Sequence, residues 1–238
     1  MTNETVFPTT QGTWLRTQVE GMNAVAGNPA LAAAARINAN AYVMERYAGP
    51  LAVFVRGSSL SRLGEPEELV NGFFASRLSD AAFLAGWSRS GMRLRRWLMN
   101  GMLFYGQGVA RDRMRAAARG GLVEPRELDE RAGADVQGES DFERAWALAV
   151  VREATARVED AMRAEGRGVD FEIFKRHAID GRPYAAFARE VGKNEQQCAG
   201  ATRLVAQRVR AALAEVLREE GVPEAELDDE IARVRAVL

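Results

Sequence analysis

Arginine side chains gather in one stretch of the chain where acidic residues are scarce. Between residues 87 and 120 there are eight arginines and a single acidic residue, Asp112. Arginine neutralises phosphate groups, and this electrostatic contribution is commonly the largest in nucleic-acid binding. We expect these side chains to form one basic face that binds phosphates. Its candidate contacts are Arg93, Arg95, Arg96, Asn100, Arg111, Arg113 and Arg115.

A second stretch, YAAFAREVGKNEQQCAGATRL at residues 184–204, consists of two short amphipathic runs separated by a glycine and an asparagine. Glycine readily adopts the left-handed backbone conformation that a tight turn needs. Asparagine caps a following helix by accepting hydrogen bonds from its first amides. The pattern is typical of a helix-turn-helix. The residues that would build it are Ala188, Gly192, Asn194, Cys198 and Ala201.

The second run of this motif leaves amide and basic side chains facing outward. Glutamine and arginine can read base edges in the major groove. We expect base contacts from Gln196, Gln197 and Arg203, with Arg208 and Arg210 nearer the DNA backbone and Lys193 adding to the basic charge. The same spacing also fits an ordinary helical hairpin that binds a protein.

Residues suited to enzymatic or metal chemistry are few. His177 is the only histidine and Cys198 the only cysteine, and a nucleophilic pair would need them adjacent, with a third group to orient them. One cysteine also excludes an intrachain disulfide and a cysteine-based zinc site. No strand followed by a glycine-rich phosphate loop is evident. We therefore expect no enzyme activity and no catalytic residue, metal, cofactor or small-molecule substrate.

The chain is nearly neutral overall, but its charges are segregated. The 238 residues carry a formal net charge of −1. Residues 122–144 hold eight acidic against three basic side chains, and a further acidic block occupies residues 215–230. The first residues lack the features of a signal peptide, and no apolar run is long enough to span a membrane. The sequence therefore predicts a cytoplasmic protein without membrane association.

Apolar residues recur at helical intervals along most of the chain, and strand-like alternation is scarce. An acidic, glycine-rich stretch has few apolar residues and is the best candidate for a linker. We predict an all-α fold of two small helical bundles joined by this linker, with the helix-turn-helix in the second bundle. The expected segments are a loosely ordered extension at 1–30, a first domain at 31–119, the linker at 120–140, a second domain at 141–221 that opens with Asp141 as N-cap, and an acidic tail helix at 222–238.

Four segments carry a resemblance to a known family. In chain order they are RYAGPLAVFVRGSSLSRLGEPEELVNGFFASRLSD, MRLRRWLMNGMLFYGQGVARDRMR, DFERAWALAVVREATARVEDAMRAEG and RPYAAFAREVGKNEQQCAGATRLVAQRVRAAL. They are similar to the polymerase-binding segment, the promoter-melting helix, the opening helix of the promoter-reading domain and the helix-turn-helix of extracytoplasmic-function sigma factors, which belong to the sigma-70 superfamily. The resemblance covers about residues 41–217 and keeps the order of the family.

The resemblance implies a protein that binds core RNA polymerase and promoter DNA and directs promoter-specific initiation of transcription. An anti-sigma factor is a further partner that the family suggests. In EPEELVNGFF, an acidic helix start and an aromatic side suit docking onto a basic helical partner. The implied polymerase contacts are Glu65, Glu67, Glu68, Asn71 and Phe74.

Two questions stay open at this point. The rings of Phe73 or Phe74, and that of Trp97, fit a core position better than an exposed contact. The main alternative function is a sigma-like protein that no longer initiates transcription, and that binds DNA through the hairpin alone or a protein through its acidic faces. Glycines where the family prefers other residues favour this alternative, namely Gly72, Gly101, Gly106, Gly108 and Gly200.

Overall fold

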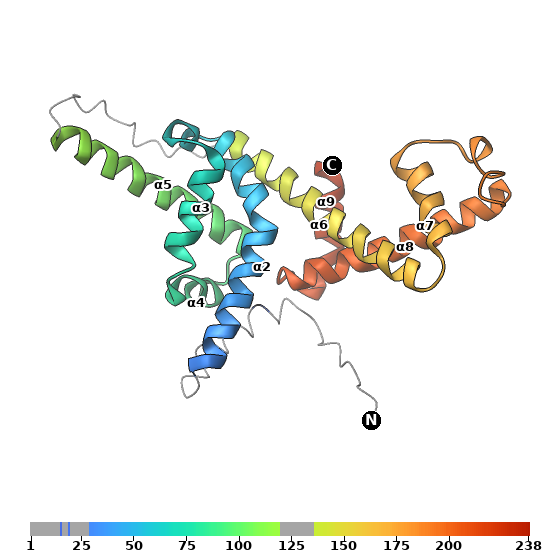
Figure 1. The fold of residues 1–238 in the computed structure, drawn as a ribbon, viewed down its shortest axis with the longest axis horizontal. Helices are drawn as coiled ribbons and strands as arrows, with labels where there is room; N and C mark the ends of the chain where they lie inside the picture. Colours follow the sequence, from blue (N-terminus) through green and yellow to red (C-terminus); the bar gives the residue numbers. More distant parts are fainter. Residues whose placement is uncertain (1–14, 16–18, 20–28, 120–135) are drawn as a thin grey trace.

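The computed structural model describes residues 15, 19, 29–119 and 136–238 (Figure 1). Within these residues the chain is helical and has no strand, which confirms the predicted all-α class. The principal helices are α2 (Pro29–Arg56), α3 (Pro66–Arg77), α4 (Ala81–Ser90), α5 (Leu94–Arg119), α6 (Val136–Ala164), α7 (Gly168–Phe174), α8 (Glu195–Glu219) and α9 (Leu227–Val237). None of the helices in the described ranges combines the length and the apolar character that a membrane span requires.

Helices α2 to α5 pack around the ring of Phe73. This ring is fully buried and makes edge contacts with Phe83 from α4 and Tyr105 from α5, at centroid distances of 5.8 and 6.0 Å. Local chemistry fixes the helix ends, since Asp80 caps α4 by accepting from the amide of Ala82 at 2.8 Å, and Gly91 ends that helix with φ +69°. The aromatic core therefore holds α3, α4 and α5 in a fixed relation.

Several glycines in this region are packing residues. A Cβ at Gly101 would lie 3.0 Å from Phe83 and 3.1 Å from Phe73, one at Gly106 would overlap Leu60, and one at Gly72 would overlap the Tyr105 hydroxyl. These positions bring helices and rings closer than any other residue allows. Close approach of neighbouring groups thus explains three of the glycines that weaken the family resemblance, Gly72, Gly101 and Gly106, whereas nothing lies within 4 Å of a Cβ at Gly108 or Gly200.

Helix α6 joins the two halves of the chain. It begins at Val136, ahead of the expected cap at Asp141, so the last part of the predicted linker is helical. At Gly138 it crosses the end of α2 closely, because an added Cβ would lie 3.2 Å from the carbonyl oxygens of Phe54 and Gly57. The rest of the predicted linker, 120–135, and most of the predicted extension, 1–30, lie outside the described residues.

One hydrophobic core runs through both halves. Its buried members extend from Leu15 to Val234 and include Phe54, Trp146 and Val216 from α2, α6 and α8. A second, smaller cluster lies between α7 and the first turns of α8. The predicted division into two separate bundles is therefore not confirmed, since α6 packs on both α2 and α8, and α9 packs on α6 and α8.

The molecule is elongated, as Figure 1 shows. The C-terminal end of α5 projects at one extremity, and the turn that precedes α8 lies at the other. Helix α9, the predicted acidic tail helix, lies between them beside α6. The two stretches with candidate DNA contacts thus reach opposite ends of the same body.

Candidate nucleic-acid interface

The turn before α8 has the geometry that its sequence predicts. Gly192 adopts φ +68°, in the left-handed region. Asn194 caps α8, because its side-chain oxygen accepts from the Gln197 amide at 2.8 Å while the Gln197 side chain accepts from the Asn194 amide at 2.9 Å. This reciprocal pair satisfies two amides that the helix start would otherwise leave free. The first residues of α8 are therefore firmly positioned.

A small core holds this turn against α7. Phe187, Ala188, Cys198 and Ala201 are buried together with Ile173 of α7. Burial raises the pKa of the Cys198 thiol, which keeps that side chain protonated and inert at neutral pH. The five residues proposed to build the motif thus lie together, with Ala188, Cys198 and Ala201 facing inward and Gly192 and Asn194 forming the turn.

The first segment of the motif differs from a regular helix-turn-helix. Tyr184–Ala186 form a single 3-10 turn that begins after Pro183, and turns continue to Gly192. The amide of Phe187 bonds to the carbonyl of Tyr184 at 3.1 Å, the tight pattern of a 3-10 turn. The Tyr184 ring stacks on His177 with centroids 3.9 Å apart, which fixes this short segment through its ring.

The outward side chains of α8 fall into two groups. Gln196 and Arg203 are exposed, and Arg203 donates only to the carbonyl of Ala199 in its own helix among the bonds of the described residues. Gln197 is exposed as well but takes part in the cap. The side chains that remain open to a partner are therefore Gln196 and Arg203.

Three other basic residues of this region, Lys193, Arg208 and Arg210, are paired with acids of the same chain. Lys193 Nζ lies 3.1 Å from Asp170, Arg208 lies 2.7 Å from Glu165, and Arg210 lies 2.8 Å from Asp228. Lys193 and Arg167 lower the pKa of Asp170 against the effect of its burial, which raises it. Arg208 lowers the pKa of Glu165 through its hydrogen bond. These bases reach a phosphate only in competition with a carboxylate.

Arg93, directly before α5, and two arginines of its first turn, Arg95 and Arg96, are likewise paired. Arg93 lies 2.6 Å from Glu226 and 2.5 Å from Glu230, and Arg96 lies 2.8 Å from Glu139. Arg95 lies 2.7 Å from Glu230 and 3.1 Å from Glu143, with its guanidinium 4.2 Å from the ring centroid of Trp146. We call the residues joined here to α9 the α9 cluster: Arg93, Arg95, Glu143, Glu226, Glu230 and Arg233.

The far end of α5 is open by contrast. Arg111, Arg113 and Arg115 are exposed. Arg111 donates to a carbonyl of its own helix, and Arg115 makes a 3.5 Å contact with Asp112 in which both side chains are exposed. Exposed pairs of this kind contribute little free energy. These three arginines are therefore available to an anionic partner.

Asn100 lies in a pocket of about 320 Å³ between α4 and α5. Phe83, Met92, Trp97 and Phe104 line it with largely apolar surface. Trp97 is partly buried, as expected, and packs on Phe83 at a centroid distance of 5.6 Å. Asn100 thus faces a mainly apolar pocket that Arg77 also lines.

Helix α3 presents an acidic edge and hides its rings. Pro66 occupies its first turn, followed by the exposed carboxylates of Glu67 and Glu68, which suit the positive end of the helix dipole. Glu67 lies 2.9 Å from Arg56, Glu65 precedes the helix and Asn71 is exposed. Phe74 is only 3% exposed and packs on Phe73. Its expected role as a polymerase contact therefore reduces to one edge of the groove beside Asn71.

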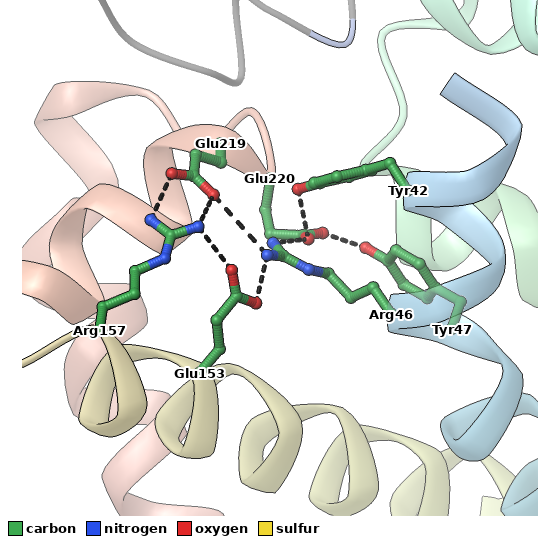
Figure 2. A network of polar contacts seen from close by, with 7 residues as sticks. All are labelled: Tyr42, Arg46, Tyr47, Glu153, Arg157, Glu219 and Glu220. Atoms are coloured by element: carbon green, nitrogen blue, oxygen red, sulfur yellow. Dashed lines mark hydrogen bonds and ion pairs between the residues drawn. The ribbon is translucent and has the colours of Figure 1, made fainter. Parts of the chain in front are cut away.

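A buried polar network joins the two halves where α8 ends, as Figure 2 shows. Arg46 pairs with Glu153 and, at 2.6 Å, with Glu220, and Tyr47 donates to Glu220. We call it the α2 network: Tyr42, Arg46, Tyr47, Glu153, Arg157, Glu219 and Glu220. Sequence reasoning missed it, because its members are far apart in the chain and the two adjacent glutamates belong to a block that looks solvated.

Charge and burial in the α2 network act on each other. Burial raises the pKa of Tyr47 and Tyr42, and Glu220 raises it further, so both phenols stay protonated and donate. Burial alone would lower the pKa of Arg46, but Glu220 raises it above its ordinary value. Arg157 bonds both oxygens of Glu219, at 2.5 and 2.6 Å. The network fixes the end of α8 against α2 and α6.

Comparison of the chain with protein-family models, curated proteins and solved structures finds no match.

The described residues hold no group of His, Cys, Asp or Glu side chains arranged to bind a metal ion. His177 Nδ1 lies 2.9 Å from the carbonyl oxygen of Arg182, and Cys198 is buried in the cluster beneath α8. Exposed candidate residues thus lie at two separated places, Arg111, Arg113 and Arg115 at the far end of α5 and Gln196 and Arg203 near the start of α8.

Proposed function

We propose that this protein is a sigma-type transcription initiation factor, which binds core RNA polymerase and promoter DNA. The observation that carries the proposal is the capped turn at Gly192 and Asn194, which fixes the start of α8 with Gln196 and Arg203 outward. A rigid helix start with polar side chains is what base reading in a major groove requires. The sequence resemblance supplies the polymerase as partner.

The exposed arginines of α5 support the proposal at the opposite end of the molecule. Arg111, Arg113 and Arg115 have no buried acidic partner among the described residues, and three such cations make a suitable surface for phosphates. On α3, Glu67, Glu68 and Asn71 form the exposed polar edge that would dock on the polymerase. Three separate surfaces then serve the three contacts that initiation needs.

The second candidate is a sigma-like regulator that binds DNA or a protein without initiating transcription. The pairing of Arg93 and Arg95 with acids of the same chain favours it, because these arginines lie in the segment that resembles the promoter-melting helix. The burial of Phe74 points the same way, since it removes an aromatic contact from the docking helix.

Run-off transcription with core RNA polymerase, on a template from upstream of the protein's own gene, separates the candidates. A sigma factor yields a discrete transcript, and replacing Arg111, Arg113 and Arg115 with Ala abolishes it. The matched control replaces three exposed arginines of α6 with Ala, namely Arg144, Arg152 and Arg163. DNA binding without any transcript would establish the regulator, and a transcript unaffected by the α5 substitutions would remove that helix from the mechanism.

Docking on the polymerase is tested by charge reversal. Glu67→Lys with Glu68→Lys weakens retention of core enzyme in a pull-down if α3 is the docking helix. The same change at Glu45 and Asp160, exposed acids of α2 and α6, serves as control. Equal retention of all three proteins at physiological salt would exclude α3 as the docking surface.

A further inference from the structure

Helix α9 presents carboxylates to arginines from both candidate DNA surfaces. Arg93, directly before α5, contacts Glu230 of α9 at 2.5 Å and Glu226, directly before α9, at 2.6 Å. On α8, Arg210 contacts Asp228 at 2.8 Å. These are the contacts that an arginine makes with phosphate oxygens, formed here with acids of the same chain.

Glu230 is the centre of this arrangement. Its side chain is 1% exposed and accepts from Arg93, Arg95 and Arg233. Burying a carboxylate costs free energy unless the carboxylate is paired with a cation. Glu230 therefore needs these arginines, and the arginines are in turn occupied by Glu230. Arg95 is the least accessible of the three arginines, because only 11% of its side chain is exposed.

Helix α9 is held in this place by an apolar side as well. Leu227, Ile231 and Val234 are buried in the core that α6 and α8 share with it. Its acidic residues therefore meet the arginines in a defined position, which a solvated acidic tail would not do. An acidic helix that is docked by apolar contacts can be displaced as one unit.

We propose that α9 is an intramolecular cover, which occupies Arg93, Arg95 and Arg210 with carboxylates and keeps polyanions from them until it is displaced. The identity of the polyanion as DNA rests on the function proposed above. The uncovered Arg111, Arg113 and Arg115 make the first contact, and full engagement of both surfaces requires the release of α9.

Two variants open the cover by different routes. Glu226→Gln with Glu230→Gln removes the competing charges and keeps the side-chain shapes. Ile231→Asn with Val234→Asn weakens the apolar attachment and leaves the charges intact. The matched control is Glu224→Gln, because Glu224 lies in the same segment but pairs with Arg218 outside both candidate surfaces. Circular dichroism and a urea midpoint establish that each variant is folded.

The first measurement does not depend on DNA binding. Phenylglyoxal modifies accessible arginines, and mass spectrometry gives the rate at each site in the full chain. In the wild type, we expect Arg93 and Arg95 to react far more slowly than Arg111. Both opened variants raise the rates at Arg93 and Arg95 severalfold and leave Arg111 unchanged, and the control leaves all three unchanged. If Arg93 in the wild type reacts as fast as Arg111, the cover does not exist.

The second measurement is binding of a labelled DNA duplex of random sequence at several salt concentrations. Freeing Arg93 and Arg95 steepens the logarithmic salt slope by about 2, because about one counterion is released for each phosphate contact. Adding Arg93→Ala and Arg95→Ala to the charge variant removes that gain. Faster arginine modification without DNA binding in any variant would sustain the cover and refute the nucleic-acid function. Unchanged modification in both opened variants would refute the cover, whatever the DNA result.

Discussion

The two ends of α5 carry the same residue type in opposite circumstances. At the start of the helix, Arg93 and Arg95 are held by Glu226, Glu230 and Glu143 from distant parts of the chain. At its far end, the arginines are exposed, and within the described part of the chain they have at most a weak local partner. A basic stretch in a sequence therefore gives the amount of charge, and the tertiary structure determines how much of it a partner can reach.

The same contrast separates the arginines that stabilise the fold from the arginines that can bind a partner. Removing an exposed arginine leaves nothing unpaired, whereas removing a buried one leaves a carboxylate without its cation. Substitutions at the start of α5 should therefore lower stability more than binding. Substitutions at its far end should lower binding more than stability, and the two properties can be measured separately.

The largest effect is expected on stability at the start of α5. Arg95→Ala leaves the buried Glu230 short of a partner and removes the cation from the Trp146 ring, so the free energy of unfolding should fall by about 3 kcal/mol. Arg113→Ala should change it by less than about 0.5 kcal/mol. Urea unfolding followed by circular dichroism measures both. Equal midpoints for the two variants would show that the α9 cluster does not bear on stability.

A smaller effect on stability is expected where α5 passes from packed to open surroundings. Gly106→Ala should destabilise by about 2 kcal/mol, because its methyl group would overlap Leu60. Gly108→Ala should stabilise by up to about 1 kcal/mol, since nothing lies within 4 Å of its Cβ position and alanine favours the helix. Thermal unfolding of the two single variants decides this. Shifts of the same sign would contradict the close approach of the helix to Leu60.

The binding effect should follow the reverse order along α5. Replacing Arg111, Arg113 and Arg115 with Ala should weaken duplex binding about tenfold and lower the salt slope by about 3. In the otherwise unchanged protein, Arg93→Ala should alter the slope by less than about 1, because Arg93 is already neutralised by Glu230. Fluorescence anisotropy across a salt series measures both. A larger loss at Arg93 would place the primary contact at the covered end.

The smallest effect is the acid dependence of the α9 cluster. Burial would raise the pKa of Glu230, but Arg95 on α5 and Arg93 directly before it hold the pKa below its ordinary value; Arg233 of α9 also contacts Glu230. The stabilisation is thus complete above the pKa that Glu230 has in the unfolded chain, about 4.3, and it is lost as pH falls through the lower pKa of the folded protein. Glu230→Gln should lack this loss.

Unfolding by urea at neutral pH and near pH 3.5 checks the acid dependence. The wild type should lose more free energy of unfolding than Glu230→Gln over this interval. Glu226 and Glu143 face the same arginines and are present in both proteins, so the difference between the proteins isolates Glu230. Parallel losses would mean that Glu230 is not paired in solution.

Local chemistry in the sequence was sufficient for the helical class and for the turn before α8. Gly192 and Asn194 act through their own backbone and nearest neighbours, so their conformation and capping follow from residue type. The first segment of the motif did not follow. A helical pattern around Tyr184 predicts a helix, yet Pro183 and the stacked His177 leave a single 3-10 turn.

The pairing of charges could not be predicted from the sequence. Arg93 and Glu230 are 137 residues apart, and nothing in either local context specifies the other. The role of Gly106 could not be predicted for a related reason. A glycine is required there because a Cβ would overlap Leu60, which belongs to a separate element. Sequence periodicity identifies the inward side of a helix but not the residues that pack against it. The candidate site depends on the identity of those residues.

The α2 network has a consequence for folding of the chain during its synthesis on the ribosome. Arg46 and Tyr47 are buried against Glu220, and Arg46 precedes it by 174 residues. At a synthesis rate of about 10 residues per second, this separation of 174 residues means that Glu220 is synthesised about 17 seconds after Arg46. During that interval the arginine and tyrosines of α2 have no native partner from the end of α8. A ribosome stalled before Glu219 would therefore hold a chain in which the α2 network is incomplete.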